Sequence, residues 1–169
     1  TIAEIKSFIV QMGSLVGSYD ASIALIEKFD LKASQIKKIT DHWLKKPRIY
    51  FEEWDDPIIS GIAWVSELIE LAGGEDIFKN LSQNSLAKDR IISDPNTIIN
   101  HQPDIILVSW CGKKLKKDKI RSREGWDKIN AIKNDYLFEI KSEIILQPGP
   151  ASLFDGLDIL HNIFLKFKP

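Results

Sequence analysis

The sequence predicts an α/β fold, with a long N-terminal helical arm followed by one Rossmann-like lobe whose mostly parallel sheet is flanked by helices. Two observations support this prediction. Apolar residues recur at three- and four-residue steps over residues 2–40, which is typical of amphipathic helices. After Pro47, β-prone runs alternate with helical patterns, which indicates βαβ units and a parallel sheet. We therefore expect a helical arm over residues 1–46 and an α/β lobe over residues 47–169.

The composition is that of an ordinary folded domain. Of the 169 residues, 44% are hydrophobic, and 23 Lys and Arg nearly balance 24 Asp and Glu. A chain so close to neutral lacks the positive charge that phosphate binding requires, so we expect no nucleic-acid partner. Cys111 is the single cysteine, which excludes an internal disulfide and a cysteine-rich zinc site. No apolar run reaches the ~18 residues that a membrane span requires.

The arm is expected to consist of two helices. One apolar stripe covers residues 2–16 and a second covers residues 23–39. Gly13 and Gly17 interrupt the first stripe, and each costs ~1 kcal/mol relative to alanine inside a helix. The sequence therefore predicts a break or a close packing contact at these glycines. Asp20 is expected to cap the second helix.

Three segments of the lobe read as strands. Residues 48–52 are a β-prone run behind a proline, and a loop is expected over residues 53–57. Residues 104–109 are continuously apolar, which is typical of a strand buried on both faces of a parallel sheet. Residues 136–140 supply the third strand.

Helical patterns lie between and after these strands. One begins at Ile58 and is expected to stop at Gly73-Gly74. Asp94-Pro95 provides a capping carboxylate followed by proline, which favours a helix start. Two further helices are expected over residues 126–133 and 153–167, and the second of them is clearly amphipathic.

Candidate site residues follow the strands, because open parallel sheets bind ligands beyond the carboxyl ends of their strands. The residues singled out for these positions are Glu53, Trp54, Ser109, Trp110, Cys111 and Gln147. The two tryptophans are expected either to form a stacking wall for a flat or bulky ligand or to pack locally on neighbouring helices.

Two other functions stay open on the residues alone. Glu52, Glu53, Asp55 and Asp56 could hold a hard cation for a metal-dependent hydrolase, although a solvated acidic loop explains them better. Glu52 and Glu53 point to opposite faces if they lie on a strand, which places them poorly for acid–base chemistry on one bond. A dimerising interaction module that buries the aromatic residues is the other alternative.

The order of several short motifs resembles a known family. The motifs are Phe51-Glu52-Glu53-Trp54, Leu71-Ala72-Gly73-Gly74, Ser93-Asp94-Pro95-Asn96, Gln102-Pro103-Asp104, Ala131-Ile132-Lys133-Asn134 and Pro148-Gly149-Pro150. The series is similar to the C-terminal lobe of the helical-backbone (class III) periplasmic solute-binding proteins of ABC importers. Members of that family carry cobalamin or iron–siderophore and haem complexes. The resemblance covers nearly the whole chain.

The resemblance implies a non-catalytic binding lobe outside the cytoplasm, without a resident cofactor or metal. It implies a corrinoid or an iron complex as ligand, held in a cleft between this lobe and a missing N-terminal lobe or a second copy of the chain. It places Glu53, Trp54, Ser109, Trp110, Cys111 and Gln147 at the ligand. It also implies that an ABC permease docks near Asp94 and Asn96, where the family often carries a glutamate.

Overall fold

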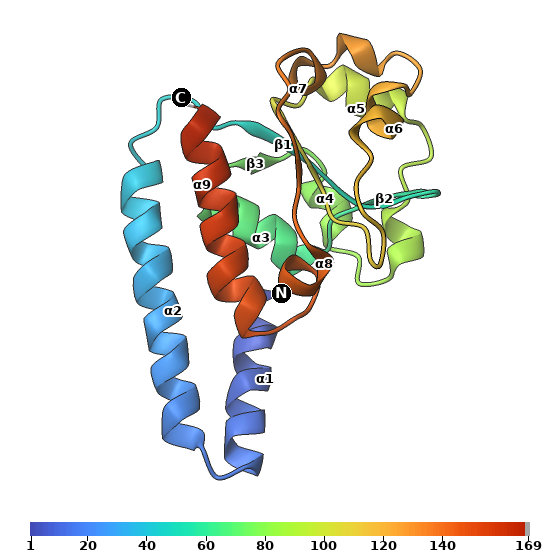
Figure 1. Ribbon diagram of the computed structural model, residues 1–169. Helices are drawn as coiled ribbons and strands as arrows, with labels where there is room; N and C mark the ends of the chain where they lie inside the picture. Colours follow the sequence, from blue (N-terminus) through green and yellow to red (C-terminus); the bar gives the residue numbers. More distant parts are fainter. Residues whose placement is uncertain (168–169) are drawn as a thin grey trace.

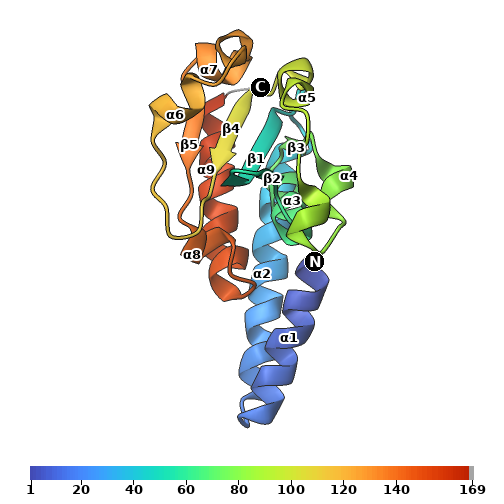
Figure 2. The same ribbon diagram turned by 90° about the vertical axis from the view of Figure 1, so that its right-hand side faces the viewer.

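The computed structural model describes residues 1–167, and these form an α/β lobe from which a helical hairpin extends (Figure 1). The hairpin consists of α1 (Ile2–Leu15) and α2 (Tyr19–Thr40). Thr1 and Glu4 form a capping box that satisfies the first backbone N–H groups of α1. The turned view shows both helices reaching well below the sheet (Figure 2).

The two glycines of the arm have different roles. Gly13 lies where α1 and α2 touch, because a Cβ built there would come within 2.6 Å of the Cβ of Ser22. Gly17 ends the first helix in a left-handed conformation with φ +71°. The prediction of a close contact or a break is therefore confirmed, with one feature at each glycine. Asp20 is not the cap of α2, since Ser18 occupies that position and Asp20 lies in the first turn.

A sheet of five strands forms the centre of the lobe. β1 (Arg48–Asp55), β4 (Ile105–Val108) and β5 (Leu137–Glu139) are parallel neighbours in that order. β2 (Ile58–Ser60) pairs antiparallel with the end of β1, and β3 (Glu75–Asp76) pairs parallel with its start. In this register Glu52 lies beside Val108, and Val108 lies beside Glu139. The carboxyl ends of the three parallel strands thus meet at one edge.

Helices cover both faces of the sheet. On one face α2, α3 (Ala63–Leu71) and α9 (Leu157–Phe167) enclose a core that includes Phe29, Leu68 and Phe164. On the other face α5 (Asn96–His101), α6 (Lys117–Arg121) and α7 (Asn130–Lys133) enclose a second core around Tyr50 and Trp126. The short α4 (Lys79–Ser82) and α8 (Ser142–Ile145) lie in the connections. The predicted α/β class with a mostly parallel sheet is confirmed.

The arm shares the first core with the lobe. Ile5 of α1 and Phe29 of α2 are buried in the same cluster as the strand residues Ile49 and Leu107. The proposed division between residues 46 and 47 stays a prediction, and residues 168 and 169 lie outside the described residues.

Several boundaries differ from the sequence prediction. β4 is buried at all four positions, as expected. β1, however, continues to Asp55, where a loop was expected, and residues 58–60 form β2 instead of the start of a helix. Gly61 and the β-branched Ile58 and Ile59 favour strand followed by a break, so α3 begins only at Ala63. A π-helical turn (Ser152–Gly156) precedes α9, which therefore starts later than predicted.

Candidate functional site

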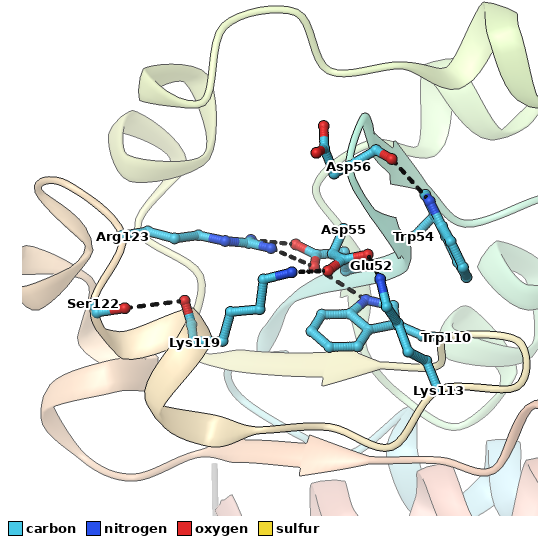
Figure 3. Close-up of polar contacts among 9 residues, drawn as sticks. All are labelled: Glu52, Trp54, Asp55, Asp56, Trp110, Lys113, Lys119, Ser122 and Arg123. Carbon is cyan, nitrogen blue, oxygen red and sulfur yellow. Dashed lines mark hydrogen bonds and ion pairs between the residues drawn. The ribbon is translucent and has the colours of Figure 1, made fainter.

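The candidate site lies at the carboxyl edge of the sheet, where β1 and the segment after β4 bring acidic, basic and aromatic side chains together (Figure 3). β1 and β4 run side by side, so the residues just beyond Glu52 and Val108 are neighbours. The segment from residue 109 to residue 123 then passes over the end of β1 and supplies its basic partners. Sequence positions 58 to 71 residues apart therefore meet here.

Glu52 is the centre of the deepest part of the site. Its side chain is fully buried, and both carboxylate oxygens accept hydrogen bonds from Arg123, at 2.6 and 2.8 Å. The hydroxyl of Tyr50 donates to the same carboxylate at 2.8 Å, and Nε1 of Trp110 donates at 3.2 Å. Burial, together with the charge of Glu52, raises the pKa of Tyr50 well above 10.0. The phenol therefore stays a hydrogen-bond donor.

Asp55 forms a second ion cluster three residues further along β1. Its buried carboxylate accepts from Nζ of Lys113 at 2.7 Å and also from Nζ of Lys119. Desolvation raises the pKa of Asp55, but hydrogen bonds and attraction from the two lysines outweigh that effect and leave the pKa below its usual value. Both lysine side chains stay about half exposed.

Trp54 is half-buried and lies beside the solvent-exposed Asp56. Its Nε1 donates to the backbone oxygen of Asp56 at 2.9 Å, which fixes the ring at the β1–β2 turn. Nζ of Lys113 lies 4.5 Å from the ring centroid, within cation–π range. The indole can thus offer an apolar surface next to a positive charge.

Trp110 does not form the exposed wall that the sequence suggested. It is 4% exposed and packs in the core around Tyr50, with its N–H engaged by Glu52. In this structure its ring supports the ion cluster from below and does not present a face for stacking. The structure instead shows Trp110 packed against neighbouring side chains.

The remaining predicted residues differ in exposure. Ser109 is completely buried and its hydroxyl has no hydrogen-bond partner among the described residues. Cys111 is a free, exposed thiol at the end of the β4 segment. Glu53 is partly exposed and forms a bidentate pair with the buried Arg90, at 2.6 and 3.1 Å. Gln147 is exposed and follows α8, the first helix after β5.

The four acidic residues do not form a metal site. Glu52, Glu53 and Asp55 each pair with their own basic partners, and Asp56 is exposed. Residues 1–167 contain no group of three or more His, Cys, Asp or Glu side chains arranged to hold a metal ion. The four-carboxylate metal site that the hydrolase alternative requires is therefore not formed, because Glu52, Glu53 and Asp55 are paired with arginine and lysine.

Sequence reasoning missed the basic half of the site. Arg90, Lys113, Lys119 and Arg123 are not among the site residues predicted from the sequence. A usable signal was present, because acidic residues at the end of a buried strand need cationic partners when they lose contact with water. The sequence does not say which of many lysines and arginines fold back.

A groove of about 950 Å³ lies beside the site, between the start of α5 and the segment 123–128. Asn96 and Arg123 both line it, so it reaches from the helix start to the ion cluster. Asp94 accepts hydrogen bonds from the backbone N–H and the side chain of Asn96, at 3.0 and 2.9 Å. Asp94 and Asn96 are both exposed at this rim.

A family model described as periplasmic binding protein matches residues 1–144, which include the arm and every strand of the sheet. The chain belongs to the periplasmic binding protein family. Members are solute-binding proteins and not enzymes, which agrees with the resemblance found in the sequence motifs. No helix within residues 1–167 is long and apolar enough to cross a membrane.

Known periplasmic binding proteins match almost all of this chain, but the chain covers only part of them. An uncharacterized ABC transporter substrate-binding lipoprotein, YvrC of Bacillus subtilis strain 168, is 23% identical over 95% of this chain and 49% of its own length. The structure of S. aureus IsdE complexed with heme has a TM-score of 0.78 and 17% identity, over 97% of this chain and 65% of IsdE. The vitamin B12 binding protein BtuF of Vibrio cholerae has a TM-score of 0.71 and 17% identity, over 99% of this chain and 62% of BtuF. The chain thus spans about half the length of the curated relative.

Proposed function

We propose that the chain is the C-terminal lobe of the solute-binding component of an ABC importer, and that residues 1–46 are the arm that joins it to a further lobe. The family match and the partial coverage of longer relatives support this. One α/β lobe offers half of a cleft, so a second lobe or a second copy of the chain completes the binding site. The component acts outside the cytoplasm and performs no catalysis of its own.

The ligand that we propose is a metal complex with a flat or bulky apolar face, either a corrinoid or an iron complex such as haem or a ferric siderophore. IsdE with heme and the vitamin B12 binding protein BtuF share this fold, which supports the ligand class. Glu53, Trp54, Cys111 and Gln147 are the contact residues. Ser109 and Trp110 lie beneath them as support, because both are buried.

Delivery of the ligand requires a permease, and we propose that the rim at Asp94 and Asn96 docks against it. Both residues are exposed beside the groove at the start of α5. Asn96 has no charge where the family often carries a glutamate, so charge pairing with the permease comes from Asp94 alone.

The half-buried ring of Trp54 at the carboxyl edge of the sheet is the observation that carries this proposal. The test is equilibrium titration of a two-lobe protein containing this chain with haem, cyanocobalamin and ferric siderophores, followed by tryptophan fluorescence. We expect quenching by at least one ligand, and an about tenfold weaker affinity in Trp54→Ala through lost stacking. Trp43→Ala is the matched control, because Trp43 precedes β1 and stacks on His161, away from this edge. No binding of any ligand by the folded protein contradicts the proposal.

A further inference from the structure

The segment that crosses the end of β1 is strongly basic, although the chain as a whole is nearly neutral. Residues 111–123 contain seven lysines and arginines and a single acidic residue, Asp118. Part of this charge is compensated inside the fold, because Arg123 pairs with Glu52 and Arg121 pairs with Asp135. Lys117 also pairs with Asp135, at 3.3 Å, whereas Lys113 and Lys119 reach Asp55 at the carboxyl end of β1.

Lys113 and Lys119 are the two lysines whose place in that edge is fixed. They share one carboxylate, that of Asp55, and no other acidic group lies within 4.0 Å of either ammonium among residues 1–167. Two positive charges on one negative charge leave the cluster with an uncompensated positive charge. Asp55 is fully buried whereas both lysines are about half exposed, so the surplus charge faces the accessible side of the cluster (Figure 3).

The same two lysines border the aromatic rings. Nζ of Lys113 lies 4.5 Å from the centroid of Trp54 and 5.6 Å from that of Trp110, and Nζ of Lys119 lies 5.7 Å from that of Trp110. Each ammonium has three N–H donors, and its bond to Asp55 uses one of them. Spare donors next to an accessible indole are suited to a ligand that combines an apolar face with a negative charge.

We propose that Lys113 and Lys119 form an anion subsite beside Trp54, so that this chain selects solutes that carry a negatively charged group next to a flat or apolar face. This inference rests on the proposed function and narrows its ligand class. Iron complexes with free carboxylates or catecholates fit the subsite. An uncharged corrinoid or trihydroxamate complex would leave the surplus positive charge of the subsite without a partner. If the two lysines served only to hold the segment on β1, their substitution would change the affinity for charged and uncharged solutes equally.

The test compares charged with uncharged probes in a two-lobe protein containing this chain. Haemin and a ferric tricatecholate are the anionic probes, and cyanocobalamin and a ferric trihydroxamate are the uncharged ones. We expect tighter binding of an anionic probe, with an affinity that falls as salt is added because salt screens exposed charges. Lys113→Gln and Lys119→Gln should each weaken that binding about tenfold, as expected for a lost charge-assisted hydrogen bond, and should leave the binding of uncharged probes unchanged.

Lys133→Gln is the matched control for the loss of one charge. Lys133 is exposed at the end of α7, before β5 begins, and so lies at the opposite edge of the sheet. Circular dichroism establishes that each variant is folded. The inference is overturned if only the uncharged probes bind, or if Lys113→Gln lowers the affinity for charged and uncharged probes equally. The proposed function stands in either case. Binding of none of the four probes overturns both.

Discussion

At the level of single residues, the end of β1 depends on matched charges. Glu52, Glu53 and Asp55 are all wholly or largely buried, and each meets a basic side chain from a distant part of the chain. Burying a carboxylate is costly unless a charged and hydrogen-bonded partner compensates it. The pairs of Glu52 and Asp55 therefore hold the segment after β4 over the end of β1, and the pair of Glu53 holds the segment before α5.

The pair between Glu52 and Arg123 is expected to be the most sensitive of them. In Glu52→Gln the guanidinium of Arg123, which is only 16% exposed, loses its counter-charge while it remains mostly buried. We expect the free energy of unfolding to fall by about 2–4 kcal/mol, measured by urea denaturation. Glu27→Gln on the exposed face of α2 removes the same charge and should stay within about 0.5 kcal/mol of the parent. Equal effects of the two substitutions would show that the pair is not a structural determinant.

The lowered pKa of Asp55 predicts that the protein loses stability in acid. Its pKa in the folded protein is below 3.8, so the folded state binds this proton less readily than the unfolded chain. The stabilisation is fully present above the unfolded pKa and disappears as the pH falls through the folded pKa. We expect the free energy of unfolding to decrease more steeply below pH ~4 in the parent than in Asp55→Asn. Parallel pH profiles for the two proteins would contradict this assignment.

Part of this site could be read from the sequence. The location at the ends of β1 and β4 follows from strand order and from the rule that ligands bind at that edge. The burial of Trp110 does not follow, because it depends on a hydrogen bond to Glu52 across 58 positions of sequence. The same is true of the lysines on Asp55, since a run of five lysines gives no indication which of them folds back.

At the level of elements, α3 ends at Gly73 for two reasons. The residue has φ +98°, a conformation that favours glycine. In addition, a Cβ there would lie 2.5 Å from a side-chain carbon of Thr40 and 2.7 Å from the ring of Trp43. The glycine therefore permits both the helix end and the close approach of the end of the arm.

Gly73→Ala should reduce the free energy of unfolding by about 2–4 kcal/mol, because backbone strain and overpacking add at this position. Thermal denaturation measures the loss. Gly149→Ala is the control, since it has no φ in the left-handed region and no atom within 4 Å of an added Cβ. A Gly73→Ala protein as stable as Gly149→Ala would contradict the packing argument.

Helix positions were predicted better than the β1–β2 hairpin. The stop at Gly73 and the start after Asp94-Pro95 were visible because capping residues have local causes. Residues 58–62 carry apolar side chains at a spacing that suits helix as well as strand. Tertiary pairing with β1 decides between them, because Ile58 and Ile59 align with Asp55 and Trp54.

At the level of the whole molecule, the helical hairpin exposes an apolar stripe. Phe8, Met12 and Leu15 follow one another at helical spacing on α1 and are 54%, 42% and 79% exposed. Figures 1 and 2 show this helix extending away from the sheet beside α2. Contiguous exposed apolar surface of this kind marks contacts with other protein surfaces.

We predict that a further lobe or a second copy of the chain covers this stripe. Expressed alone, the chain should therefore self-associate, with an apparent mass in light scattering that rises with concentration. The double substitution Phe8→Ser, Leu15→Ser should lower this association without lowering the melting temperature, because both side chains are already largely exposed to water. Leu31→Ser, at a 62% exposed site on α2, provides the control for removal of an apolar side chain. A parent chain that stays monomeric at every concentration would show that this face does not bind a second copy of the chain.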